Sequence, residues 1–103
     1  MNEYSSDIQR YCSSVDEAAV KTIVNYCGIA LRNRDSSLVS ATDPQELATV
    51  RDGFAARKLG LSADTADAAI QSVAERMKAD RHKHRVTFYY LLAEATGTLD
   101  KLR

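Results

Sequence analysis

Some features are scarce in this chain, and each scarcity narrows what the protein can be. A single proline and four glycines among 103 residues leave little room for flexible linkers or disordered segments. No apolar run approaches the about 20 residues that a membrane-spanning helix needs. Only two cysteines occur, and residues 1–7 show neither the basic head nor the apolar core of a secretory signal. We therefore expect a cytoplasmic protein that contacts no membrane and keeps Cys12 and Cys27 as free thiols.

The charge of the chain is balanced. Its 14 lysines and arginines are matched by 14 aspartates and glutamates, so the formal net charge is zero. A dedicated nucleic-acid-binding protein usually carries a strong basic excess, so we do not expect nucleic acid as the main partner, although a local basic patch is compatible with this balance. The hydrophobic content of 45% is ordinary for a soluble globular protein. The length predicts one domain over residues 1–103.

Helix-start signals occur at two places in the first half. Ser14 and Glu17 fit a capping box, and the apolar residues that follow predict a helix ending at Gly28. A glycine there supplies a left-handed conformation, with Ile29 folding back as its hydrophobic contact. The segment 43–58 begins with Asp-Pro-Gln-Glu, in which the aspartate caps a helix and the proline favours its first position. We expect this whole segment to be one helix.

Two further helices are predicted in the second half. Apolar residues within 66–77 recur at spacings of three and one, which is nearly ideal for one face of a helix. Wound at about 100° per residue, the stretch 86–95 is apolar nearly all round, with only Thr87 and Glu94 forming a narrow polar stripe. Such a helix is buried among other helices or covered by a partner. With a short helix over 4–12, the chain is predicted to be an all-α, single-domain bundle of about five short helices.

Three stretches carry a resemblance that covers nearly the whole chain. They are residues 16–20 (Asp-Glu-Ala-Ala-Val), 28–32 (Gly-Ile-Ala-Leu-Arg) and 85–94 (Arg-Val-Thr-Phe-Tyr-Tyr-Leu-Leu-Ala-Glu). In them the chain resembles a small family of uncharacterised bacterial proteins, known only as a domain of unknown function. The resemblance implies a helical fold and a bacterial, cytoplasmic setting, and it implies no activity.

A second, partial resemblance covers residues 44–95. The Leu59-Gly60-Leu61 loop, the helix over 66–77 and the stretch 86–92 are similar to the loop and the last two helices of ubiquitin-associated domains, in the variant form attached to some protein kinases. In that family the glycine loop and the third helix bind other proteins, so the resemblance implies protein binding here. The loop lacks the methionine and the aromatic residue of the family, which argues against ubiquitin itself as the partner.

We expect a non-catalytic function in which the protein binds another protein or itself. Tyr89 and Tyr90 are the favoured contact residues, because tyrosine offers a large apolar area with a polar tip. The opposing interpretation is that both tyrosines belong to the core. The candidate contact surface is apolar and consists of Leu59, Gly60, Leu61, Tyr89, Tyr90 and Leu92.

A basic segment supplies the alternative function, which is binding of nucleic acid or another polyanion. Phosphate groups attract clustered cations, and the cations of this segment are Arg76, Lys78, Arg81, Lys83 and Arg85. The simpler interpretation is a solvated helix end, where cations are favoured by the helix dipole. The neighbouring aromatic residues do not alternate with the basic ones as in a stacking platform.

The sequence contains no recognisable motif for catalysis, a cofactor or a metal. There is no Gly-rich phosphate loop and no nucleophile elbow. His82 and His84 would lie on different sides of a helix, and no Cys/His pair lies nearby at zinc-site spacing. Cys12 and Cys27 lie on apolar stripes, so we expect buried structural thiols. We therefore predict that the protein is not an enzyme and needs no cofactor.

Overall fold

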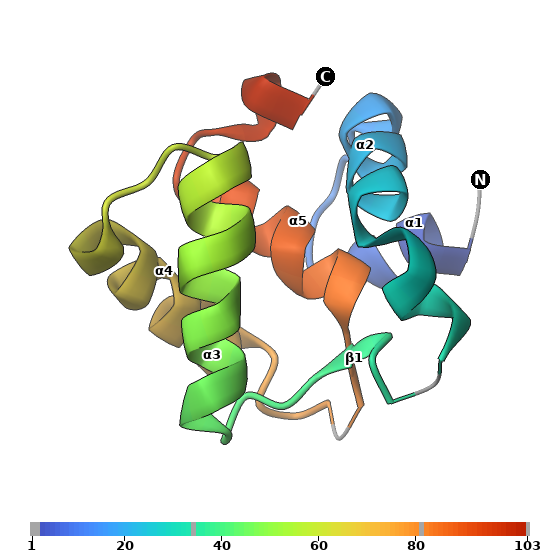
Figure 1. The fold of residues 1–103 in the computed structure, drawn as a ribbon. Helices are drawn as coiled ribbons and strands as arrows, with labels where there is room; N and C mark the ends of the chain where they lie inside the picture. The colour runs from blue at the N-terminus through green and yellow to red at the C-terminus, as the bar shows by residue number, and fades with distance from the viewer. Residues whose placement is uncertain (1–2, 34, 81, 103) are drawn as a thin grey trace.

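A computed structural model describes residues 3–33, 35–80 and 82–102 (Figure 1). Its α-helices are α1 (Glu3–Ile8), α2 (Glu17–Cys27), α3 (Pro44–Val50), α4 (Ala63–Arg76) and α5 (Arg85–Ala95). A π-helical segment and two short 3₁₀ helices accompany them, namely η2 (Arg51–Lys58), η1 (Gly28–Arg32) and η3 (Leu99–Leu102). Two antiparallel strands complete the fold, β1 (Leu38–Val39) and β2 (Lys83–His84). The prediction of an all-α, single-domain bundle is confirmed, with this strand pair as a small addition.

The helix α5 occupies the centre of the bundle (Figure 1). It is contacted by α1, α2, α4 and η2, and every side chain from Val86 to Ala93 is buried. The polar side chain of Thr87 is buried with the rest. An apolar helix of this kind is stable in water only when neighbours cover each of its faces. The prediction of a helix inserted among other helices, packed against the 66–77 helix, is therefore confirmed. Among the described residues, no helix combines the length and hydropathy needed to cross a bilayer.

The start of α2 differs from the predicted capping box. Asp16 is the cap, and its carboxylate accepts a hydrogen bond from the amide of Ala19 at 3.1 Å. The prediction of Ser14 as the cap is wrong, because an aspartate immediately before the first turn satisfies the free amides of the helix start. Glu17 is likewise used elsewhere, since its carboxylate accepts from the Ser5 hydroxyl at 2.7 Å. That contact joins α2 to α1.

The predicted helix over 43–58 is continuous, and its second half winds as a π-helix (Figure 1). The carboxylate of Asp43 accepts from the Gln45 amide at 3.0 Å, which confirms the predicted start. Gly53 lies within the π-helical half, and the hydroxyl oxygen of Tyr26 is 3.7 Å from where its Cβ would be. That separation is an ordinary van der Waals contact, so space for a methyl group exists at this glycine.

Polar contacts fasten the N-terminal part to the end of α4 and the start of α5. The buried hydroxyl of Thr87 donates to the Asp7 carboxylate at 2.5 Å. Arg10 donates to Asp80 at 2.6 Å, and the Tyr11 hydroxyl donates to the same carboxylate. These hydrogen bonds, with Arg10 contributing most, lower the pKa of Asp80. The bundle thus closes around α5 through charge-assisted bonds as well as apolar packing.

Candidate functional site

The apolar surface expected near the last helix is mostly interior. Its four bulkiest side chains are no more than 5% exposed: Leu59, Tyr89, Tyr90 and Leu92. Leu61 is half-buried and Gly60 is exposed. The four bulky side chains are therefore core residues of the monomer and do not form a contact surface. The sequence pattern showed that α5 needs covering on all faces, and the chain's own helices provide that cover.

The cations of the predicted polyanion-binding segment are engaged within the chain. Each described lysine or arginine of the segment has a carboxylate or carbonyl partner: Arg76 on Glu94, Lys78 on Glu75, Lys83 on the carbonyl of Asp80, and Arg85 on Glu46. Arg81, the fifth predicted cation, lies outside the described residues. Three of these four partners are carboxylates, so they offset the positive charge that a polyanion would meet.

Arg85 is largely enclosed by the chain. Its Nη2 donates to the Glu46 carboxylate at 2.5 Å, and the two side chains are only 11% and 19% exposed. The same guanidinium donates to the carbonyls of Ser36 at 2.7 Å and Leu38 at 3.2 Å, and to the Tyr89 hydroxyl at 3.0 Å. Burial would lower the pKa of Arg85, but attraction to Tyr89 and Glu46 outweighs it and raises that pKa. Arg85 therefore holds the 36–38 loop, α3 and α5 together.

An exposed apolar site that the sequence did not reveal lies where α2 meets η1. Among the described residues, the exposed large hydrophobic side chains are Tyr26 at 39% and Ile29 at 80%, which we call the α2–η1 corner. Gly28 ends α2 with a positive φ of 48°, but its ψ of −114° lies outside the left-handed helical region that the sequence predicted. The prediction that Ile29 folds back onto the helix is wrong, because the chain continues into η1 and Leu31 packs against the core instead.

A hollow of about 310 Å³ opens beside the corner, and we call it the Tyr89 hollow. It is lined by Tyr26, Cys27, Ala30, Glu46, Thr49, Arg85 and Tyr89. The ring of Tyr89 stacks on Phe54 with centroids 4.2 Å apart, and Tyr26 meets Phe54 edge-on at 5.4 Å. These contacts fix one aromatic wall. The Arg85–Glu46 ion pair provides the polar part of the lining.

The side chains of the Tyr89 hollow are neutral apart from the ion pair. Burial raises the pKa of the Cys27 thiol to about 11 and also raises the pKa of Tyr89. Both groups are therefore protonated near neutral pH. The Tyr89 hydroxyl accepts from Arg85, and no described residue accepts its own proton. The hollow consequently contains a buried hydroxyl donor next to a salt-bridged carboxylate.

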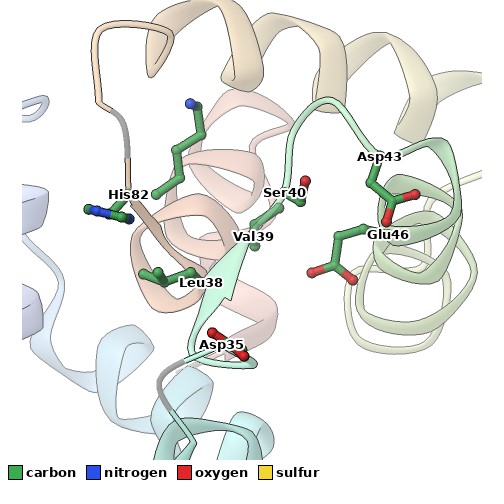
Figure 2. A pocket seen from close by; sticks show the side chains of 8 residues that line it. Asp35, Leu38, Val39, Ser40, Asp43, Glu46 and His82 are labelled. Atoms are coloured by element: carbon green, nitrogen blue, oxygen red, sulfur yellow. The ribbon is translucent and has the colours of Figure 1, made fainter.

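A second hollow, of about 300 Å³, shares Glu46 with the first. Figure 2 shows Glu46 on α3 and Asp43 just before that helix on one side of the hollow, with Asp35 near one end of β1 and His82 on the far side of the strand. Asp43 already caps α3 and Glu46 already binds Arg85. Within the described part of the chain, no group of three or more His, Cys, Asp or Glu residues could hold a metal ion.

The comparisons with known proteins place the chain in a family without assigning an activity. Comparison with curated proteins gives no match. A family model described as "Protein of unknown function (DUF2853)" matches residues 3–100, which is nearly the whole chain. The resemblance to an uncharacterised family is thus confirmed. The chain belongs to the DUF2853 family of proteins of unknown function.

Proposed function

We propose that this protein is a non-catalytic module that binds another protein, or a second copy of itself, through the α2–η1 corner. The observation that carries the proposal is the exposure of Ile29 at 80%, next to the partly exposed ring of Tyr26. Covering an isoleucine side chain contributes roughly 1.5–3 kcal/mol to association. Tyrosine is enriched at the energetic centres of protein interfaces, since it combines a large apolar area with a polar tip.

The arrangement of Tyr26 favours a contact surface. Its ring lies against Phe54 and is 6.4 Å from the ring of Tyr89, while the Lys58 ammonium is 5.5 Å from its centroid. A side chain held by such contacts loses little conformational entropy when a partner binds. The corner therefore combines an apolar contact residue, Ile29, with a neighbour that is already ordered.

The state of the cysteines supports a non-catalytic role and a cytoplasmic location. Cys12 and Cys27 are both free and buried. Burial raises the pKa of each thiol to about 11, with Glu94 adding to the effect at Cys12. The thiolate is the nucleophilic form of cysteine, so these thiols are poor nucleophiles near neutral pH. Free thiols are typical of a reducing compartment, which supports our proposal of a cytoplasmic location. The bacterial setting is proposed from the family resemblance alone.

The test is a pull-down with the tagged protein from a nuclease-treated bacterial lysate at moderate salt, read by mass spectrometry. Light scattering of the purified protein at several concentrations measures self-association in parallel. The informative variant is Ile29→Asp, which places a charge on the corner. Ser72→Asp is the matched control, because it adds the same charge at an exposed position on α4, on the opposite side of the bundle from α2 (Figure 1).

We expect a discrete partner, or dimerisation, that is lost with Ile29→Asp and kept with Ser72→Asp. A partner retained equally by both variants contradicts the proposal. Recovery of partners only when nuclease is omitted would also contradict it, and would favour polyanion binding through the basic segment between Arg76 and Arg85. In that case the complex would weaken steeply as salt is raised.

A further inference from the structure

We propose that the Tyr89 hollow is a binding site for a small, neutral, planar amide, such as an aromatic carboxamide. This inference goes beyond the contact at the α2–η1 corner: Tyr26 belongs to both sites, but Ile29 does not line the hollow. It is carried by three properties of the lining residues: a paired donor and acceptor, a balanced charge, and aromatic and apolar walls.

The donor and the acceptor are held on one guanidinium. Arg85 binds the Tyr89 hydroxyl through Nη1 at 3.0 Å and the Glu46 carboxylate through Nη2 at 2.5 Å. Both oxygens are therefore bound to one rigid planar group, and both residues line the hollow. The Tyr89 hydroxyl accepts from Arg85 and can donate its one proton, and the Glu46 carboxylate has lone pairs left to accept. An amide presents the complementary pair, a carbonyl acceptor beside an N–H donor.

The charge of the hollow selects a neutral ligand. Arg85 and Glu46 form the one ion pair in its lining, and together they carry no net charge. A ligand carboxylate would meet the Glu46 carboxylate, and a ligand cation would meet the Arg85 guanidinium. Either encounter sets like charges together in a partly desolvated place, where repulsion is stronger than in bulk water. A neutral amide forms both hydrogen bonds without that repulsion.

The remaining walls suit a flat ring of modest size. Tyr26 offers a partly exposed aromatic ring, and Ala30 and Cys27 add small apolar groups. Offset or edge-on contact with an aromatic ring is favourable for another ring. A volume of about 310 Å³ is at the lower end of ligand pockets, so the site fits a single ring with its substituent rather than a large cofactor.

Nicotinamide is a suitable probe, because it is a neutral ring with one carboxamide. We expect saturable changes in backbone amide NMR shifts of the full chain, centred on the lining residues Cys27, Ala30, Thr49 and Tyr89. Nicotinate has the same ring with a carboxylate in place of the amide, and 3-(aminomethyl)pyridine carries a cation there. Both should bind at least about tenfold more weakly than nicotinamide, since each meets a like charge. This comparison needs no protein variant.

The variant Tyr89→Phe tests the donor. It should weaken nicotinamide binding about tenfold, which is the upper range for loss of one hydrogen bond. Tyr90→Phe is the matched control, since its hydroxyl accepts from the Asp16 amide at 2.8 Å and does not line the hollow. Ile29→Asp should leave nicotinamide binding unchanged, which separates failure of this site from failure of the protein contact. The inference is overturned if nicotinamide gives no saturable shifts, if nicotinate binds as well, or if Tyr89→Phe binds like the native chain.

Discussion

Arg85 donates from Nη2 to the Glu46 carboxylate at 2.5 Å and so joins the first turn of α5 to the first turn of α3. The same side chain binds two carbonyls of the 36–38 loop and the hydroxyl of Tyr89. One arginine therefore positions the polar part of the Tyr89 hollow and fixes the connection before α3. Arg85 therefore has a structural role, which is to hold these segments together. The Glu46 carboxylate and the other acceptors of the same chain largely satisfy its charge.

Removing this guanidinium should destabilise the fold strongly. Arg85→Met leaves the Glu46 carboxylate, 19% exposed, without its cation. We expect the free energy of unfolding to fall by roughly 3 kcal/mol, as when one partner of a buried pair is removed. Urea denaturation followed by circular dichroism measures it.

Lys78→Met serves as the control for that measurement. Lys78 and Glu75 form a pair whose side chains are 72% and 71% exposed, so its loss should change the free energy of unfolding by less than about 1 kcal/mol. If Arg85→Met loses no more stability than Lys78→Met, the organising role of Arg85 is wrong.

Two glycines should respond in opposite directions to the same substitution. Gly28 has a φ of 48°, which a side chain disfavours, so Gly28→Ala should lower the free energy of unfolding by about 1 kcal/mol. Gly53 is helical with the Tyr26 hydroxyl 3.7 Å from its Cβ position, so Gly53→Ala should raise stability by up to about 1 kcal/mol. Thermal melting of both variants decides the matter, and a gain at Gly28 would contradict the described backbone.

Alkaline pH should destabilise the protein through three buried or half-buried groups. Burial raises the pKa of Cys12 and Cys27 from 9.0 to about 11 and that of Tyr11 from 10.0 to about 12. Above pH 9 the unfolded chain loses these protons before the folded chain does. The folded state then binds more protons, so stability falls as pH rises. These groups contribute their full stabilisation below pH 9, and the contribution is lost up to about pH 12.

Urea midpoints at pH 7, 9 and 10.5 test this pH dependence. We expect little change from these groups between the first two values and a clear fall at the third. The control is Cys27→Ala in parallel, which removes one of the three groups and should flatten the fall. An unchanged midpoint at pH 10.5 in the native chain would refute the assignment of these groups as buried and protonated.

The anchoring of α1 should depend on one buried hydroxyl. Thr87→Val removes the donor to Asp7, whose carboxylate is 14% exposed. Arg10 still binds the other oxygen of Asp7 at 2.7 Å, so we expect a loss of about 1.5–3 kcal/mol, the contribution of one hydrogen bond to a charged group. Hydrogen exchange should accelerate in Glu3–Ile8 and stay nearly unchanged in α2. Thr96→Val is the control, since that hydroxyl bonds to the Leu92 carbonyl within its own helix end. Equal acceleration in both variants would argue against a specific anchor.

Structural features that depend on a local sequence pattern could be predicted from the sequence. The all-round apolar character of 86–95 predicts a central helix, and Asp43-Pro44 predicts the start of α3. In both cases the determining residues are neighbours in the chain. The likeness of residues 44–95 to ubiquitin-associated domains is not tested by these contacts and stays a prediction.

The candidate site could not be predicted in the same way, because it depends on contacts between distant residues. Arg85 meets Glu46 across 39 positions, and no periodicity links them. The sequence predicted that Tyr89 contacts a partner. Its burial instead depends on which helices surround α5, and the sequence pattern does not show that arrangement. The sequence predicted that Ile29 folds back onto the helix. A positive φ at Gly28 is compatible with that arrangement and also with continuation into η1. Only the backbone beyond the glycine distinguishes them.

Binding through the α2–η1 corner is tested most directly by the amount of partner, or of dimer, that Ile29→Asp retains relative to the native chain. The side chain is 80% exposed, so the substitution should change the free energy of unfolding by less than about 0.5 kcal/mol. In the complex, the variant loses the burial of an isoleucine side chain and buries a charge in its place. These two changes should weaken the complex at least tenfold. A loss of that size, with Ser72→Asp unaffected, is the predicted result. A complex that forms equally well with the Ile29→Asp variant and with the native chain would contradict binding through the α2–η1 corner.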